Sequence, residues 1–179
     1  MKWEKDVPSW FEWTKTQLSA NQVVGLDFSQ YPASAVKTRI EFFKEAEITV
    51  QSVPNLVDKV WSEERPVRPT NPCKVLDIKY HGKSSLDKQE QIAAKIANES
   101  YEALLVTTLD DICWITNLRG TDIEYNPVFF AYALFYPKRA ADSEEPRVVL
   151  YVTESKVAEI GDYLSEQKIK VCPYEAITE

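Results

Sequence analysis

The chain has 179 residues, a length that suits one domain or one and a half, and its 44% hydrophobic and 27% charged residues are typical of a globular protein. Its formal net charge of −7 argues against non-specific nucleic-acid binding, which needs concentrated lysine and arginine. No apolar run approaches the roughly 20 residues of a membrane-spanning helix, and the charged N-terminus lacks the apolar stretch of a signal peptide, so we expect a cytoplasmic protein that binds neither nucleic acid nor membrane.

The first part of the chain alternates helical and extended patterns. Ser9 is placed to cap a helix that begins at Trp10, because its hydroxyl can accept a hydrogen bond from a free amide of the first turn. The next predicted elements are a strand over Val23–Phe28, a helix over 32–46, a strand over Ile48–Val53, and a helix over Leu56–Trp61 capped by Asn55. Two strands are too few for a sheet that is stable alone, so this half either borrows a neighbouring chain or belongs to a larger domain.

Prolines interrupt the pattern after this half. Pro66, Pro69 and Pro72 recur at intervals of three, which excludes a regular helix and favours an extended, polyproline-like path. We interpret this segment as a linker between two domains.

The second half predicts a complete set of helices and strands. A helix capped by Ser84 or Ser85 and ending about Ser100 precedes a short apolar strand over Ala103–Thr107, which we expect at the buried centre of a sheet. The remaining predicted elements are a helix over Leu109–Leu118 with a Thr108–Asp111 capping box and a stop at Gly120, a strand over Val128–Tyr136, a polar loop over 138–146, a strand over 147–152, a helix capped by Thr153, and a strand over Ile169–Cys172. Together these elements predict an α/β fold in which helices flank a mixed β-sheet.

Few residues suit catalytic chemistry. The three cysteines, Cys73, Cys113 and Cys172, are scattered and odd in number, which argues against a disulfide framework and suits a reducing compartment. The single histidine, His81, is predicted to be an ordinary loop residue, and Asp110 and Asp111 fit the first turn of a helix better than an acid–base pair. No paired metal-ligand spacing or glycine-rich phosphate loop occurs, so we expect no catalytic residue, metal ligand or cofactor in this chain.

Charged residues gather in one stretch, NLRGTDIEYNPVFFAY, directly before an aromatic run. Arg119 and Asp122 flank Gly120, and the arginine could present its planar guanidinium to a carboxylate or carbonyl group. Alternatively, the two side chains brace the turn as a local ion pair, or Asp122 caps the backbone. Tyr125 and Asn126 are predicted to form a turn that leads into the following strand.

Three stretches of the chain resemble one known family. VGLDFSQYPAS, VPNLVDKVWSEERPVRP and LDDICWITNLRGTDIEYNPVFFAYALFY are similar to segments of the three-domain Xaa-Pro aminopeptidases of eukaryotic type (aminopeptidase P). The resemblance extends over nearly the whole chain, and its last motif is long and specific. It implies a creatinase/prolidase N-terminal-like fold, with residues 1–73 as the end of a first, related α/β domain plus a proline-rich linker and residues 74–179 as the second, middle domain.

The resemblance also implies a function. The chain would be the non-catalytic N-terminal and middle region of a metal-dependent enzyme that removes the N-terminal residue from peptides with proline second, and it would wall the active site and support assembly. The catalytic pita-bread domain would be absent together with its two divalent metal ions, manganese in this family, so that the chain alone is inactive. The implied partners are that catalytic domain, the peptide substrates and a second copy in a homodimer, with Arg119, Asp122, Tyr125 and Asn126 at the substrate pocket or a domain interface. The alternative is a stand-alone interaction protein of the same fold without peptidase activity.

Overall fold

The computed structural model describes residues 6–139 and 144–178. The chain divides into two compact units between Pro66 and Val67, inside the proline-rich segment. Residues 65–73 contain no helix or strand, as their prolines predict. No helix in the described part of the chain combines the length and apolar character that a membrane crossing needs.

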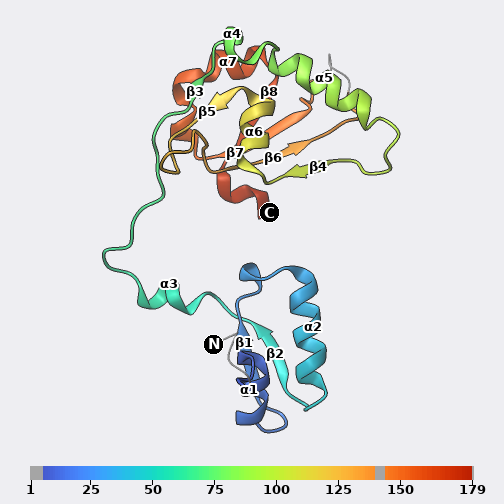
Figure 1. Ribbon diagram of the computed structural model, residues 1–179, viewed down its shortest axis with the longest axis vertical. Helices are drawn as coiled ribbons and strands as arrows, with labels where there is room; N and C mark the ends of the chain where they lie inside the picture. The colour runs from blue at the N-terminus through green and yellow to red at the C-terminus, as the bar shows by residue number, and fades with distance from the viewer. Residues whose placement is uncertain (1–5, 140–143, 179) are drawn as a thin grey trace. The chain divides into compact units, whose positions relative to one another are not determined.

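The first unit is a small α/β layer (Figure 1). Its elements are α1 (Trp10–Gln17), β1 (Val23–Leu26), a 3-10 turn η1 (Phe28–Gln30), α2 (Ala33–Lys44), β2 (Thr49–Ser52) and α3 (Leu56–Val60). The caps predicted at Ser9 and Asn55 are both confirmed, since Ser9 forms a capping box with Glu12 and Asn55 accepts from the amide of Val57. β1 and β2 pair in parallel and are the two strands of this unit in the described residues.

The second unit contains a mixed four-stranded sheet in the order β4-β6-β7-β8, which confirms the predicted fold class. β6 pairs antiparallel with both β4 and β7, whereas β7 and β8 run parallel. Its elements are β3 (Lys74–Val75), α4 (Ile78–His81), α5 (Ser85–Lys95), β4 (Leu104–Val106), α6 (Leu109–Thr116), β5 (Leu118–Arg119), β6 (Ala131–Phe135), β7 (Val148–Val152), η2 (Glu154–Lys156), η3 (Ala158–Ile160), α7 (Gly161–Glu166), β8 (Ile169–Cys172) and η4 (Tyr174–Thr178). β3 and β5 form a separate antiparallel pair beside this sheet.

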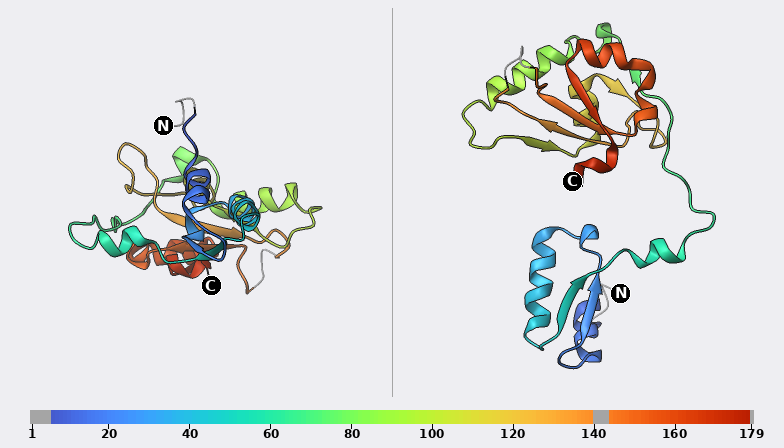
Figure 2. Two further views of the ribbon diagram at one scale, coloured as in Figure 1. Left: turned by 90° about the horizontal axis from the view of Figure 1, so that it is seen from below. Right: turned by 180° about the vertical axis from the view of Figure 1, so that it is seen from behind.

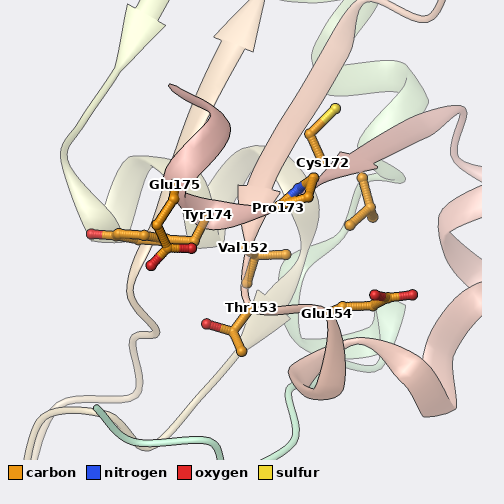
Figure 3. Close-up of a pocket in the computed structure, with 8 residues that line it drawn as sticks. Val152, Thr153, Glu154, Cys172, Pro173, Tyr174 and Glu175 are labelled. Carbon is orange, nitrogen blue, oxygen red and sulfur yellow. The ribbon is translucent and has the colours of Figure 1, made fainter. Parts of the chain in front are cut away.

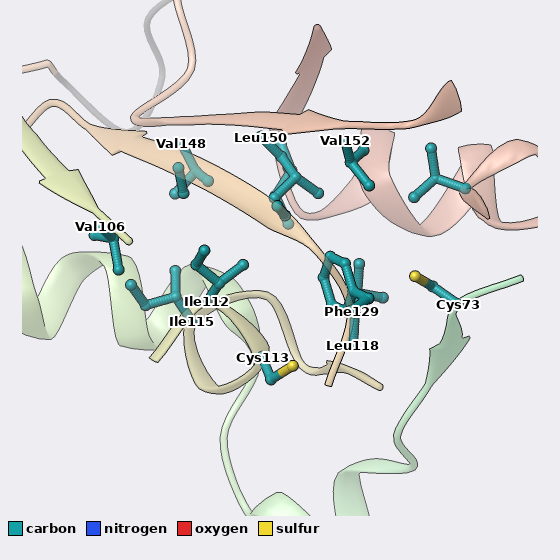
Figure 4. Close-up of a cluster of buried hydrophobic side chains, with 14 of the residues drawn as sticks. Cys73, Val106, Ile112, Cys113, Ile115, Leu118, Phe129, Val148, Leu150 and Val152 are labelled. Atoms are coloured by element: carbon teal, nitrogen blue, oxygen red, sulfur yellow. The ribbon is translucent and has the colours of Figure 1, made fainter. Parts of the chain in front are cut away.

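The core of the second unit lies between the sheet and helices α5, α6 and α7, while η4 covers the opposite face (Figures 1 and 2). Along β6, Ala131, Ala133 and Phe135 are buried toward the helices, and Tyr132 alternates to the other face and contacts Tyr174 of η4. Phe129, Leu118 and Cys73 belong to the same buried cluster (Figure 4). Both faces of the strand are thus covered by other elements, which is why its side chains are apolar on both.

The strand predicted at the centre of the sheet lies at its edge. β4 pairs with β6 alone, and Leu104 and Leu105 are 40% and 51% exposed. The expectation was wrong because a short apolar run fits a central strand and a partly covered edge strand equally well. The number of strands that pair with it decides between them, and that depends on the order of strands in the whole sheet.

Several predicted helix boundaries were also wrong. Thr108 makes no side-chain capping bond, and α6 ends at Thr116 with Asn117 in the left-handed conformation at φ 56°. Gly120 is required for close packing instead, because a Cβ there would lie 2.6 Å from the Cβ of Phe129. α5 ends at Lys95, five residues before Ser100.

Other boundaries moved for local reasons. The helix expected after Thr153 is split into η2, η3 and α7, and Thr153 makes no side-chain capping bond. β1 stops at Leu26 because Asp27 accepts the amide of Ser29 and turns the chain, and β6 begins only at Ala131. Residues 140–143 of the predicted polar loop over 138–146 lie outside the described residues.

Candidate functional site

The charged stretch forms an ordered loop between β5 and β6. The amide of Gly120 donates to the carbonyl of Pro127, and the amide of Asp122 donates to the carbonyl of Val128, at 3.2 and 3.1 Å. A bridge between Ile123 and Asn126 closes the tip. The loop is therefore held by backbone hydrogen bonds in the manner of a hairpin.

The tip of the loop exposes an aromatic side chain. Tyr125 is 98% exposed and has a φ of 62°, a left-handed conformation that residues with a bulky side chain rarely adopt. Asn126, next to it, is also exposed. The loop thus presents Tyr125 to solvent from a backbone that its hydrogen bonds hold in a strained conformation.

A buried ion pair anchors the loop. The carboxylate of Asp122 lies 2.5 Å from Nζ of Lys156 in η2, and neither side chain is exposed to solvent. The same carboxylate accepts a hydrogen bond of 2.7 Å from the amide of Phe130. Asp122 therefore does bond to the backbone, as one of the two structural interpretations held, but its ion-pair partner is Lys156 and not Arg119.

Arg119 acts on the preceding helix. Its Nη1 donates to the carbonyl of Cys113 at 3.0 Å and to that of Leu118 at 2.8 Å. Among the described residues its Nε and Nη2 have no hydrogen-bond partner, and the side chain is half-buried. The guanidinium is thus fixed by one nitrogen and keeps donors for a further acceptor.

Arg119 is one of four side chains that satisfy the C-terminus of α6. The last four carbonyls of an α-helix have no partner inside the helix, and here each accepts from a side chain. The four donors are Arg119 to Cys113, Lys88 Nζ to Trp114 at 2.8 Å, Ser85 Oγ to Ile115 at 2.7 Å, and Tyr163 Oη to Thr116 at 2.9 Å. Two of the donors are cations, which suit the negative end of the helix dipole.

Lys88 is buried, and no carboxylate of the described residues pairs with it. It is 2% exposed, and its ammonium donates to the side-chain oxygen of Asn117 and lies 4.7 Å from the centre of the Trp114 ring. Burial, followed by the charge of Arg119, lowers the pKa of Lys88 below its usual 10.5. The Asn117 amide in turn donates to the carbonyl of Lys83 at 3.0 Å.

This polar cluster was not predicted from the sequence, although a signal was present. Ser85, Lys88 and Gln89 are spaced at i, i+3 and i+4 and share the inner face of α5 with Ala93. Polar side chains of these types usually face solvent. Their helical spacing places them on one face, and only the partners on α6 reveal why polar groups occupy it.

The other residues considered for chemistry lie apart from the loop. Asp110 and Asp111 are exposed in the first turn of α6, and His81 Nε2 lies 2.9 Å from the carbonyl of Leu76. The three cysteines are free, and burial raises the pKa of Cys73 to about 12. Within residues 6–139 and 144–178, no three His, Cys, Asp or Glu side chains come together as a metal ion would require.

A separate cavity of about 420 Å³ lies at the carboxyl ends of the parallel strands β7 and β8 (Figure 3). It is lined by Val152–Glu154 and Val171–Glu175 and contains none of the residues of the charged stretch. The guanidinium of Arg68 lies over the ring of Tyr174 beside it, at 4.1 Å, and pairs with Glu175.

Comparisons with known proteins find related sequences and a related fold. The model of the creatinase/prolidase N-terminal domain family matches residues 64–179. A probable Xaa-Pro aminopeptidase P of Pyricularia oryzae is 38% identical over 98% of the chain, and one of Colletotrichum graminicola is 39% identical over 97%. The chain covers only 28% and 27% of these two relatives, so it spans little more than a quarter of their length.

A solved structure shares the fold. The X-prolyl aminopeptidase of Caenorhabditis elegans, described as a cytosolic enzyme with a di-nuclear active site, matches with a TM-score of 0.77 and 25% identity. The match covers 97% of this chain and 27% of that enzyme.

Proposed function

The chain belongs to the creatinase/prolidase N-terminal domain family, and from this membership we propose that it is the non-catalytic N-terminal and middle region of a metal-dependent Xaa-Pro aminopeptidase. The parent enzyme removes the N-terminal residue from peptides whose second residue is proline. One observation carries the proposal: the similarity covers almost all of this chain but only about a quarter of relatives named for that activity.

We place the catalytic residues and metal ions of the parent enzyme outside this chain. Two divalent ions, manganese in our proposal, belong to a catalytic domain of the same polypeptide, where they would supply a metal-activated water. Residues 1–73 are the end of the first N-terminal domain with its linker, and residues 74–179 are the middle domain. The parent is proposed to be cytoplasmic, and homodimerisation is part of the same proposal.

Within this region, the loop from Arg119 to Asn126 is the part proposed to face the catalytic domain or the substrate. The buried Asp122–Lys156 pair and the capped end of α6 hold the loop, while Tyr125 and Asn126 are exposed at its tip. Tyr125 has a strained backbone conformation, and residues of this kind cluster at functional sites. Arg119 is proposed as a positioning residue, because one of its nitrogens is fixed and the others remain available.

The proposal predicts that the chain alone is inactive. Purified chain supplied with manganese should neither bind the ion tightly by calorimetry nor release the first residue of an Xaa-Pro-Pro peptide, because its described residues bring no ligand set together. Turnover that persists after contaminating peptidases are removed would contradict it.

The transcript distinguishes the peptidase from a stand-alone interaction protein. A reading frame that continues past Glu179 into a domain rich in Asp, Glu and His supports the peptidase, and a stop codon there supports the interaction protein.

The role of the loop can be tested in the parent enzyme with Arg119→Ala. A displacement of about an ångström in a positioning group can lower a rate on the order of 100-fold, so we expect kcat/KM to fall by more than the loss of stability explains.

Tyr125→Ala should lower kcat/KM with no change in melting temperature, because the side chain is 98% exposed. Tyr80→Ala, at a residue that is 71% exposed on α4, is the matched control. An unchanged kcat/KM in both loop variants would leave the loop with a structural role only.

A further inference from the structure

We propose that the outer edge of β4 binds an extended peptide segment that carries alternating apolar side chains and a lysine or arginine. β4 is the terminal strand of the sheet and pairs on one side only, with β6. No other backbone group of the described residues bonds to its outer side. An edge of this kind offers free N–H and C=O groups to an added strand.

The side chains around this edge are apolar and accessible. Leu104 and Leu105 point to opposite faces of the sheet, since neighbours in a strand alternate, and each is at least 40% exposed. A groove of about 320 Å³ runs beside the strand, and Trp114 of α6, 45% exposed, forms part of its wall together with Ile92. Alternate apolar side chains of an added strand would fill this groove, while its backbone continues the sheet.

Charge determines which partner fits. Asp111 lines the groove beyond the carboxyl end of β4, Asp110 precedes it, and neither has an ion-pair partner among the described residues. At the other end of the strand Glu102 pairs with Lys138 at 2.9 Å, so the unpaired negative charge lies beyond the carboxyl end. A second copy of the chain would bring two net charges of −7 together, whereas a basic segment is attracted to the carboxylates of Asp110 and Asp111.

The test uses the full chain and a labelled eight-residue peptide in which valine alternates with threonine and one end carries a lysine. Binding is followed by fluorescence anisotropy, with a matched peptide N-methylated at alternate positions. We expect saturable binding that the N-methylated peptide loses, because strand addition depends on backbone amides. Leu105→Glu should weaken binding by about tenfold or more, since a charge on an edge strand opposes strand addition.

Two controls exclude attraction to the overall negative charge. Leu105→Glu makes the chain more acidic, so non-specific attraction would strengthen binding in this variant, and Leu56→Glu, at a leucine that is 62% exposed in the first unit, should leave the affinity unchanged. Asp111→Asn should weaken binding by roughly two- to fivefold, the range of an exposed ion pair. The proposal fails if the N-methylated peptide binds equally, if Leu105→Glu binds as tightly as the original chain, if no saturable binding occurs, or if ultracentrifugation shows a dimer that Leu105→Glu abolishes.

Discussion

At the scale of single residues, the Asp122–Lys156 pair places two opposite charges in the interior of the protein. Both side chains are fully buried, and the aspartate also accepts the amide of Phe130, so the pair joins the loop to η2 and to the start of β6. Two buried charges are tolerated when they satisfy each other, and either one alone is strongly unfavourable. The position of the loop therefore depends on an interaction between two residues that are 34 positions apart in the sequence.

The first prediction tests this pair. Asp122→Ala should lower the free energy of unfolding by about 3–5 kcal/mol, because it leaves the Lys156 charge buried without a partner. The double variant Asp122→Leu with Lys156→Met should recover most of this loss, since it removes both charges. Urea denaturation of the three proteins measures the effect. A loss below about 1 kcal/mol for the single variant, the value typical of exposed pairs, would contradict it.

A second residue-scale prediction concerns pH and Cys73. Burial raises the pKa of this thiol from its usual 9.0 to about 12, so above pH 9 the unfolded chain loses the proton while the folded chain keeps it. The stability that the protonated thiol provides is thus complete below pH 9 and lost as the pH rises toward 12. The difference in unfolding free energy between the original chain and Cys73→Ala should shrink by about 1.4 kcal/mol from pH 7.5 to 10. A difference that stays constant would mean that the thiol titrates normally.

At the scale of elements, α6 depends on side chains from outside the helix. It has only eight residues, and helices this short are not stable on their own. Its last four carbonyls are satisfied from α5, β5 and α7, that is, by residues on both sides of it in the chain. The candidate loop begins directly after this end, so the caps of the helix also determine where the loop starts.

The third prediction removes one of these caps. Tyr163→Phe should lower the free energy of unfolding by about 1–3 kcal/mol, because the carbonyl of fully buried Thr116 loses its donor. Tyr80→Phe removes the same hydroxyl from a side chain that is 71% exposed and should have little effect. Thermal melts of both variants decide the matter, and equal melting temperatures would show that the cap contributes nothing.

At the scale of the whole molecule, the end of the proline-rich segment belongs to the second unit. Arg68 pairs with Glu175 at 2.9 Å and lies over the ring of Tyr174. The amide of Cys73 donates to the carbonyl of Lys156 at 2.7 Å, and its side chain is 3% exposed in the core. The first unit has two paired strands in its described residues, which leaves both outer strand edges open.

The fourth prediction follows from this division. A protein of residues 67–179 should melt cooperatively, because it holds its own sheet and core. A protein of residues 74–179 should melt at a lower temperature, since it lacks Cys73 and Arg68. Residues 1–66 alone should be unfolded or self-associated, because two strands do not form an independently stable sheet. Calorimetry and ultracentrifugation test all three, and a monomeric, cooperatively melting 1–66 would contradict the last.

Elements whose cause is local were predictable. The Ser9 and Asn55 caps and the strand Ile169–Cys172 follow from residue types at nearby positions, and the structure confirms them. Of the alternatives for this turn, the Arg119–Asp122 ion pair was wrong, because Lys156, which is far away in the sequence, pairs with the aspartate. Nothing in the local pattern distinguishes one cation from another as a partner.

The sequence by itself determined the family, the α/β class and the stretch in which the candidate site lies, because helical and strand periods and a long specific motif are properties of residue order. Only the tertiary structure decided that β4 is an edge, that Gly120 is needed for contact with Phe129, and that Lys88 is buried at the end of α6. Each of these depends on which distant atoms meet. Such meetings are set by the packing of the whole core, in which every side chain has several neighbours from other elements.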